Sequence, residues 1–390
     1  MPKIDFDNIE VAFAHKSDQE LKKAYWIFSL FNILWLNKIL NILGGIAFSM
    51  KLPLGFIVQN NIFKHFCGGT TLMKCEKTVD LVKAHNVESN LDYSVEAKNS
   101  NEAFDKTRNE IVNNINFAVT TSSLTFTSVK ITGLCHSSIL EKLDAKKVLT
   151  PLESEDYEKA QNRLNDICKA AFENKIKLFI DAEESWIQDT IDELTDLMMA
   201  RYNKEEVIIY NTFQMYRADK LEFLKASLKK AEKIGYLLGA KLVRGAYMEK
   251  EAEFAIKNNR ANPICTTKEE TDLSFDNGTA YCLEHIDKIG LVAATHNELS
   301  TQKVIDWMEE FQIEKNNRNV FFAQLYGMSD HISFNIAKEG YNVCKYIPYG
   351  PVNDVIPYLI RRAQENTSIS GQMGRELSLL KSEMKRRKLI

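Results

Sequence analysis

Two adjacent arginines near the end of the chain share one face of an expected helix with an aromatic and an acidic side chain. In the segment 358–366, Tyr-Leu-Ile-Arg-Arg-Ala-Gln-Glu-Asn, the residues Tyr358, Arg361, Arg362 and Glu365 follow the i, i+3, i+4, i+7 spacing. Two neighbouring guanidinium groups can hold a small carboxylate through parallel hydrogen bonds. Taken alone, the helix favours the alternative, which is a solvated face stabilised by an Arg361–Glu365 ion pair.

The elements that would position such side chains are short apolar runs that alternate with amphipathic segments from residue 88 onward. The expected strands are 89–95, 124–132, 177–182, 206–210, 240–245, 290–294, 319–324 and 341–347. The expected helices are 100–119, 155–174, 186–201, 218–238, 268–288, 298–314, 329–338 and 354–366. This succession of strand and helix predicts an α/β protein with a (β/α)8 barrel. An open doubly wound sheet is the alternative, but no G-x-G-x-x-G sequence follows a strand.

Every expected strand carries a polar side chain at or just beyond its carboxyl end. In chain order these are Glu96, Lys130, Asp181, Gln214, Arg244, His296, Gln324 and Lys345. One such residue is most often half of a structural ion pair. Because the carboxyl ends of barrel strands meet at one mouth, the recurrence in every unit predicts a polar active site there.

The chemistry of this mouth is limited by the residue types present. No Ser/His/Asp arrangement and no carboxylate–histidine group with metal-ligand spacing stands out, so no metal centre is expected. Lys130 and Lys241 could each form a Schiff base, as in aldolases. However, Glu96 and Asp181 are available as their charge partners, and a paired lysine stays protonated. A cationic, aromatic mouth without an obvious nucleophile is typical of a site for an organic cofactor.

The segments on either side of the barrel domain, which is expected over residues 86–370, have helical patterns. Residues 1–85 predict an N-terminal helical region, and residues 371–390 predict a solvated basic helix as a C-terminal tail. The apolar stretch 25–50 is interrupted by Asn32, Asn37, Lys38 and Asn41. Buried helices are therefore expected rather than a membrane span, with association at a bilayer surface as the alternative.

The composition indicates the cellular compartment and limits the classes of partner. The formal net charge of −3 gives no basic excess, so no nucleic-acid partner is expected. Seven cysteines without a C-x-x-C pair indicate reduced thiols. The acidic start of the chain resembles neither a signal nor a transit peptide. A cytoplasmic protein is predicted, with peripheral contact to the inner face of the membrane as an option.

Five segments of the chain resemble the signature blocks of the proline dehydrogenase family. They are Ile-Asp-Ala-Glu-Glu-Ser (180–185), Lys-Leu-Val-Arg-Gly-Ala-Tyr (241–247), Ala-Thr-His-Asn (294–297), Gln-Leu-Tyr-Gly-Met-Ser-Asp (324–330) and the arginine segment 358–366. The blocks follow the family's order along a chain of the monofunctional type. The resemblance implies a distorted (β/α)8 barrel that oxidises L-proline to 1-pyrroline-5-carboxylate with FAD and passes the electrons to a membrane quinone. This would be the first step of proline catabolism to glutamate, with a separate pyrroline-5-carboxylate dehydrogenase acting next.

The resemblance also implies roles for individual residues. Asp181 and Lys241 match catalytic positions. The positions that bind the substrate match Lys130, Tyr346, Tyr358, Arg361 and Arg362, with Glu96 holding Lys130 in place. The positions around FAD match Ala182, Gln214, Val243, Arg244, Gly245, Ala246, Thr295, His296, Leu325 and Glu365.

The strand-five block departs from many bacterial members, because this chain has Lys241 and then Arg244 where they have Arg and then Lys. The order found here also occurs in the mitochondrial-type branch. Since side chains alternate along a strand, Lys241 is expected to face inward beside the isoalloxazine. Arg244 is then expected at the rim, beside the ribityl chain or the pyrophosphate. Which of the two contacts the reactive flavin nitrogen stays open.

Three alternative functions are retained. The first is a hydroxyproline dehydrogenase, which Tyr346 disfavours because that branch of the family has a smaller residue there. The second is a Schiff-base barrel that uses Lys130 or Lys241, disfavoured by their charged partners. The third is a non-enzymatic scaffold whose apolar N-terminal segment docks a membrane partner, disfavoured by the polar groups at the strand ends.

Overall fold

The computed structural model describes residues 3–32, 58–94, 99–121, 124–352, 354–355, 359 and 372–390. Its eight strands form a closed barrel in the order β1 to β8. They are β1 (Glu88–Tyr93), β2 (Leu124–Val129), β3 (Lys177–Ile180), β4 (Ile209–Gln214), β5 (Leu238–Val243), β6 (Ile289–Ala294), β7 (Val320–Leu325) and β8 (Val343–Tyr349). The predicted (β/α)8 barrel is therefore confirmed.

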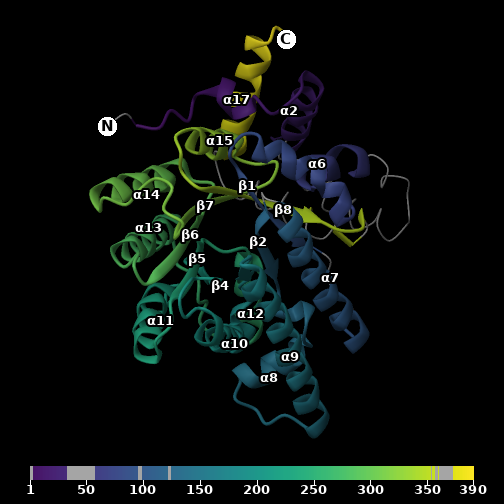
Figure 1. Cartoon of the computed structure of the whole chain (residues 1–390), viewed down its shortest axis with the longest axis vertical. Coiled ribbons are helices and arrows are strands. Elements are labelled where there is room, and N and C mark those ends of the chain that lie inside the picture. Colours follow the sequence, from purple (N-terminus) through teal and green to yellow (C-terminus); the bar gives the residue numbers. More distant parts are fainter. Residues whose placement is uncertain are drawn as a thin grey trace. The chain divides into compact units, whose positions relative to one another are not determined.

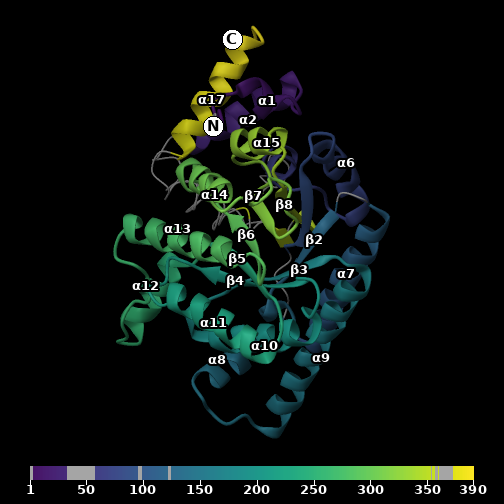
Figure 2. The ribbon, with the colours of Figure 1, turned by 60° about the vertical axis from the view of Figure 1, so that its left-hand side comes forward.

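Helices precede, connect and follow these strands. They are α1 (Ile9–Phe13), α2 (Asp18–Asn32), α5 (Lys64–Phe66), α6 (Leu72–Lys83), α7 (Asn101–Thr120), α8 (Ser137–Asp144), α9 (Pro151–Asn174), α10 (Ser185–Tyr202), α11 (Lys220–Ile234), α12 (Met248–Lys257), α13 (Lys268–Glu284), α14 (Glu298–Glu310), α15 (Asp330–Lys338) and α17 (Gln372–Arg386). Figures 1 and 2 show α10, α11 and α13 on the outer side of the strands β4 to β6 that they contact. Helices α8 and α12 were not expected from the sequence.

The chain divides into two compact units. The first unit comprises Met1–Ser89, Ser94–Glu96 and Gln324–Ile390, and the second comprises Asn90–Tyr93 and Ala97–Ala323. The second unit therefore holds β2 to β6 and most of β7. The domain boundaries that the sequence suggests, at residues 85 and 370, remain predictions.

The interior of the second unit is packed with aromatic rings. Phe126 of β2 stacks on Phe179 of β3, with the ring centroids 4.6 Å apart, and meets the edge of Phe321 of β7 at 4.9 Å. All three side chains are buried. Burying a side chain of this kind contributes about 1.5–3 kcal/mol, so these layers hold the strand ends in fixed positions.

Strand β4 ends at Gln214, four residues beyond the end of the apolar run that predicted it. Its second half carries Asn211, Thr212 and Gln214, which are polar yet buried. Each donates a hydrogen bond inside the fold, to the Asp192 carboxylate, to the Ile180 carbonyl and to the Glu183 carbonyl respectively. Because these partners satisfy the polar groups, the strand continues where the hydrophobic pattern ends.

The first unit has a hydrophobic core of its own, and the C-terminal helix α17 is part of it. Leu379, Leu380 and Met384 are buried in one cluster with Phe13 and Leu21. Helix α17 lies along α2, as Figure 1 shows. The expected solvated tail is thus wrong, because an i, i+4 pair of apolar residues faces the N-terminal helices.

The apolar stretch 25–50 is only partly described, since residues 33–57 lie outside the described residues. Within the part of the chain that the structure describes, no helix is long and apolar enough to cross a membrane. All seven cysteines lie among the described residues, and none of them forms a disulfide.

Candidate active site

The carboxyl ends of β2, β3 and β5 bring three charged side chains of the second unit together. Asp181 follows the last residue of β3, and its backbone N–H donates to the carbonyl of Val129 at the end of β2. Lys241 Nζ of β5 lies 2.5 Å from Asp181 Oδ1, and Lys130 Nζ lies 3.1 Å from Asp181 Oδ2. One carboxylate therefore bridges two ammonium groups.

The two lysines differ in their access to solvent. The Lys241 side chain is 6% exposed, and its Nζ lies 4.7 Å from the centre of the Phe179 ring inside the barrel. The Lys130 side chain is 40% exposed. Lys130 can therefore keep its bond to Asp181 and still offer further N–H groups to a ligand, since an ammonium group has three donors.

The electrostatic surroundings keep Lys130 charged. Desolvation acts to lower the pKa of Lys130, but the negative charge of Asp181 and the further groups around Lys130 together outweigh it, so the net pKa is raised. Asp92 and Glu183 raise the pKa of Lys130 further. A lysine that stays protonated is a poor nucleophile, so this environment does not favour a Schiff base at Lys130.

Arg244, directly after β5, forms three hydrogen bonds with the neighbouring elements. Its Nε donates to Asp272 of α13 at 2.6 Å, and its two terminal nitrogens donate to Thr295 Oγ1 at 2.6 Å and Ser300 Oγ at 2.9 Å. The guanidinium therefore points away from Lys241 and towards α13 and α14, as strand alternation predicts. Thr295, which follows β6, also accepts a hydrogen bond from the N–H of Asn297, the N-cap of α14.

The turn after Arg244 leaves its main chain open. Gly245 has a φ of 138°, and a Cβ built there would lie 2.5 Å from the ring of Tyr216. Gly245 and Ala246 are both exposed. Glycine is required here because any side chain at this position would collide with the Tyr216 ring. The exposed turn beside a fixed arginine suits the polar chain of a large anionic cofactor.

The remaining residues of the second unit that are predicted to contact a cofactor lie at the same ends of the strands. Gln214 of β4 is buried, and its side-chain amide donates to the carbonyl of Glu183 at 2.7 Å. Ala182 is buried directly after Asp181, while Val243 and His296 are half-buried.

Two of the predicted site residues that the structure describes lie in the first unit. Leu325 at the end of β7 and Tyr346 of β8 are both half-buried. The loop after β7 joins β8 through the N–H of Tyr326, which donates to the carbonyl of Tyr346 at 2.9 Å.

Lys345, which the sequence placed among the groups at the mouth, is instead fully buried. Its Nζ lies 2.9 Å from Asp330 Oδ1 and donates to the carbonyl of Met328 at 2.5 Å. Asp330 also pairs with Lys16 at 3.0 Å and lies 3.3 Å from His15 Nε2. Lys345 is thus part of a buried polar cluster rather than a group open to a ligand.

Five predicted site residues lie outside the described residues. They are Glu96, Tyr358, Arg361, Arg362 and Glu365. The roles given to them remain predictions.

Glu183 and Thr132 were not predicted from the residues at the strand ends. Their side chains meet between the loops after β3 and β2, where Thr132 Oγ1 donates to Glu183 Oε2 at 2.5 Å. The signal was present, because Glu183 belongs to the acidic segment Asp-Ala-Glu-Glu (181–184) directly after a strand.

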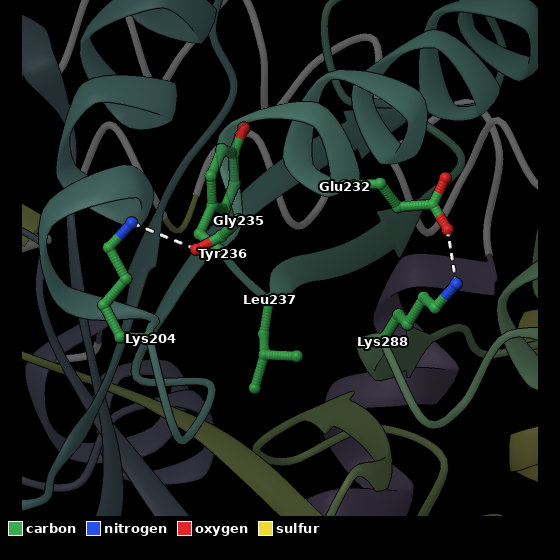
Figure 3. A pocket seen from close by; sticks show the side chains of 6 residues that line it. All are labelled: Lys204, Glu232, Gly235, Tyr236, Leu237 and Lys288. Atoms are coloured by element: carbon green, nitrogen blue, oxygen red, sulfur yellow. Dashed lines mark hydrogen bonds and ion pairs between the residues drawn. The ribbon is translucent and has the colours of Figure 1, made fainter.

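A hollow of about 320 Å³ lies elsewhere on the second unit, at the loops that lead into β4, β5 and β6. Figure 3 shows its lining, in which Lys204 donates to the carbonyl of Gly235 at 3.0 Å and Lys288 pairs with Glu232 at 2.5 Å. Both lysines are engaged by protein oxygens, and the catalytic mouth of a barrel is at the opposite ends of the strands. Among the described residues, no group of three or more His, Cys, Asp or Glu side chains could hold a metal ion.

A closed barrel with charged side chains at the carboxyl ends of its strands defines a (β/α)8 enzyme. The family model "Proline dehydrogenase" matches residues 75–375. The chain therefore belongs to the proline dehydrogenase family, whose members are oxidoreductases that act on proline.

Relatives named as proline dehydrogenases cover most of the chain. "Proline dehydrogenase 1, mitochondrial" of Dictyostelium discoideum is 31% identical over 433 residues, covering 99% of this chain and 75% of that protein. "Proline dehydrogenase 2, mitochondrial" of Arabidopsis thaliana is 33% identical, covering 85% of this chain and 79% of that protein. "Hydroxyproline dehydrogenase" of Xenopus laevis is 37% identical, covering 65% of this chain and 56% of that protein.

A solved structure shares the fold. Proline utilization A of Bdellovibrio bacteriovorus, inactivated by N-propargylglycine, superimposes with a TM-score of 0.72 at 21% identity over 96% of this chain. This chain spans 38% of that longer protein. At this identity the likeness concerns the fold alone.

Proposed function

We propose that the chain oxidises L-proline to 1-pyrroline-5-carboxylate, with FAD as the bound cofactor. The observation that carries the proposal is the Asp181 carboxylate between Lys130 and Lys241, at the carboxyl ends of the strands. Lys241 provides a fixed positive charge in the barrel interior, and the half-exposed Lys130 provides a second positive charge for a ligand. The exposed turn at Gly245 beside Arg244 supports a large anionic cofactor next to it.

In the proposed reaction the chain holds the substrate by its acid group. Arg361, Arg362 and Lys130 bind the proline carboxylate, and Tyr346 and Tyr358 flank the ring, which fixes the orientation of the ring carbon. The excess positive charge lowers the pKa of the proline amine, so that the nitrogen lone pair is free. A bound FAD would supply the acceptor for the hydride that this carbon releases.

The side chains around the cofactor have separate proposed tasks. Lys241, oriented by Asp181, donates a hydrogen bond towards the flavin ring and stabilises negative charge there. Arg244, Gly245 and Ala246 hold the ribityl chain or the pyrophosphate. Ala182, Gln214, Val243, Thr295, His296, Leu325 and Glu365 complete the cofactor site, and Glu96 pairs with Lys130.

The decisive test is an anaerobic titration of the FAD-reconstituted protein with L-proline. The flavin absorbance is expected to bleach in proportion to the proline added, with 1-pyrroline-5-carboxylate identified as the product. A protein that binds no FAD, or whose flavin is unchanged by proline, would overturn the proposal.

The division of roles has its own test in Arg361→Ala. This substitution is expected to raise the KM for proline far more than it lowers the FAD content, because a lost bidentate contact to a carboxylate removes about 1.5–3 kcal/mol. Arg318→Ala, at an exposed loop position, is the matched control and should change neither value. Equal losses of proline affinity and FAD content in Arg361→Ala would contradict the assignment.

The similarity to the Xenopus hydroxyproline dehydrogenase supports a second candidate substrate. Tyr346 occupies the position at which the hydroxyproline-oxidising branch has a smaller residue, so proline is the proposed substrate. Comparison of kcat/KM for L-proline and hydroxyproline decides between them.

The electron acceptor and the location are further proposals. We infer a quinone as the acceptor, with the protein in the cytoplasm at the inner face of a membrane and a separate enzyme that oxidises the product. The Dictyostelium and Arabidopsis relatives are named mitochondrial. Reoxidation of the reduced protein by a soluble quinone, and its partition between membrane and soluble fractions, would test these points.

A further inference from the structure

We propose that Glu183 is a positioning residue, whose carboxylate aims Lys130 at the substrate and whose main-chain carbonyl holds the amide of Gln214 at the cofactor. The inference rests on the proposed function, because it assigns to a third residue the placement of two site residues. No role was given to Glu183 by the sequence or by the family resemblance.

Glu183 joins three elements of the second unit through four hydrogen bonds. Its carboxylate accepts from the N–H of Thr132 at 3.0 Å and from Thr132 Oγ1 at 2.5 Å. Its own N–H donates to Gln188 Oε1 at 2.8 Å, and its carbonyl accepts from Gln214 Nε2 at 2.7 Å. The residue is 3% exposed, so these bonds are shielded from water.

The bonds to Thr132 fix the loop that carries Lys130. Lys130 directly precedes the short 3₁₀ turn Ile131–Gly133, and Thr132 is the central residue of that turn. Holding both the N–H and the hydroxyl of Thr132 limits rotation of the turn. The direction of the Lys130 side chain, which is 40% exposed, then depends on this anchor.

Glu183 is itself anchored by a buried network behind it. Gln188, which accepts from the Glu183 N–H, donates through its amide to Asp192 Oδ1 at 2.9 Å. Asp192 pairs with Lys220 of α11 at 2.8 Å and accepts from Asn211 of β4 at 2.9 Å. The support therefore extends from the loop after β3 through α10 to α11 and β4.

A purely structural role would not require a carboxylate at this place. Burial raises the pKa of Glu183, while its hydrogen bonds to Thr132 oppose that rise. Taking a charge out of water is unfavourable, and an apolar residue of similar size would often stabilise such a position better. The carboxylate is explained if both acceptor oxygens are needed to hold the loop of Lys130.

The test compares Thr132→Val with Thr190→Val. Thr190 of α10 makes the same pair of bonds, its N–H and hydroxyl both donating to the carboxylate of Asp144 in α8. Each substitution removes one hydroxyl bond to a carboxylate and should lower the unfolding temperature by a similar amount. Only Thr132→Val is expected to raise the KM for proline, by about threefold, because one hydrogen bond less leaves the loop less ordered.

The second arm uses Glu183→Ala and Glu183→Gln. Glu183→Ala is expected to lower kcat/KM for proline by about tenfold or more through misplacement of Lys130. The bond from Gln214 goes to the main-chain carbonyl of residue 183 and persists in this variant, so binding of FAD to the apoprotein, measured by fluorescence quenching, should change little. Glu183→Gln keeps an acceptor for the Thr132 N–H and should restore most of the lost kcat/KM.

Equal proline KM values for Thr132→Val and Thr190→Val would overturn the inference, and this pair decides even if Glu183→Ala does not fold. Retention of normal kcat/KM for proline by a folded Glu183→Ala would overturn it as well. Failure of the wild-type protein to be bleached by proline would instead refute the proposed function, so the two failures are distinguishable.

Discussion

Removal of the Asp181 carboxylate is the perturbation with the largest expected effect on the barrel. Asp181→Asn leaves two ammonium groups, Lys130 and Lys241, without the charge that lies 3.1 Å and 2.5 Å from them. Breaking a buried ion pair by removing one partner costs about 3–5 kcal/mol. Since the Lys241 side chain is 6% exposed, we expect Asp181→Asn to lower the free energy of unfolding by about 4 kcal/mol.

The two lysines should contribute unequally. Lys241→Met leaves Asp181 paired with Lys130, so a smaller loss of about 3 kcal/mol is expected. Lys130→Met removes a pair whose lysine side chain is 40% exposed, so solvent screening limits the loss to about 1 kcal/mol or less. In the double variant Asp181→Asn/Lys241→Met, the losses should be less than additive, because no unpaired buried ammonium remains on β5.

Urea unfolding followed by circular dichroism, with FAD removed from all variants, measures these differences. The predicted order of destabilisation is Asp181→Asn, then Lys241→Met, then Lys130→Met. A Lys130→Met loss as large as that of Asp181→Asn would refute the reasoning. So would strict additivity in the double variant, since it would mean that Asp181 and Lys241 do not interact.

Three further predictions concern other parts of the molecule. Burial lowers the pKa of His15 to about 4 and that of His65 to about 3, from the ordinary value of 6.5. Below about pH 6.5 these histidines are therefore protonated in the unfolded chain but still neutral in the folded protein, so the free energy of unfolding falls as the pH falls. Between pH 7.5 and 5, each histidine should lower the free energy of unfolding by about 2 kcal/mol, measured by urea unfolding at each pH. His15→Phe should make the free energy of unfolding less dependent on pH, and an unchanged pH dependence would contradict this prediction. Leu380→Ala should lower the free energy of unfolding of the first unit by about 3 kcal/mol, as expected for a buried leucine, whereas a loss below about 1 kcal/mol would show that α17 is not packed. Arg244→Met, which loses three hydrogen bonds, should weaken FAD binding by about tenfold or more while the KM for proline changes little; titration of the apoprotein with FAD checks it, and unchanged affinity would place the cofactor elsewhere.

The barrel could be predicted from the sequence because alternating strands and helices leave a periodic apolar signal. The limits of that signal are visible at β4, where Asn211 and Gln214 are polar but buried. Their partners, Asp192 and the Glu183 carbonyl, lie on other elements. A pattern of hydrophobicity along the chain contains no information on hydrogen bonds to distant residues. The strand predicted at 206–210 therefore ended too early.

The same limit applies to the candidate site. The position of Lys345 after an apolar run resembles that of Lys130, yet Lys345 is buried against Asp330. The cluster is completed by His15 and Lys16, more than 300 residues earlier in the chain. The sequence offered Asp181 as the partner of Lys241, and this pair is confirmed. Glu96, offered as the partner of Lys130, lies outside the described residues, and the described contact of Lys130 is also with Asp181. That one carboxylate would serve both lysines depends on the folded geometry and could not be predicted from the strand ends.

The packing of α17 has a consequence for how the chain is made. Arg387 donates to the carbonyls of Phe13 and Lys16 and pairs with Asp18, and Met384 is buried in the cluster that contains Phe13. During synthesis, the first helices therefore leave the ribosome long before the residues that cover their apolar side are translated. Until then that apolar side is accessible to chaperones or to premature association, so α1 and α2 can complete their packing only after α17 has been translated.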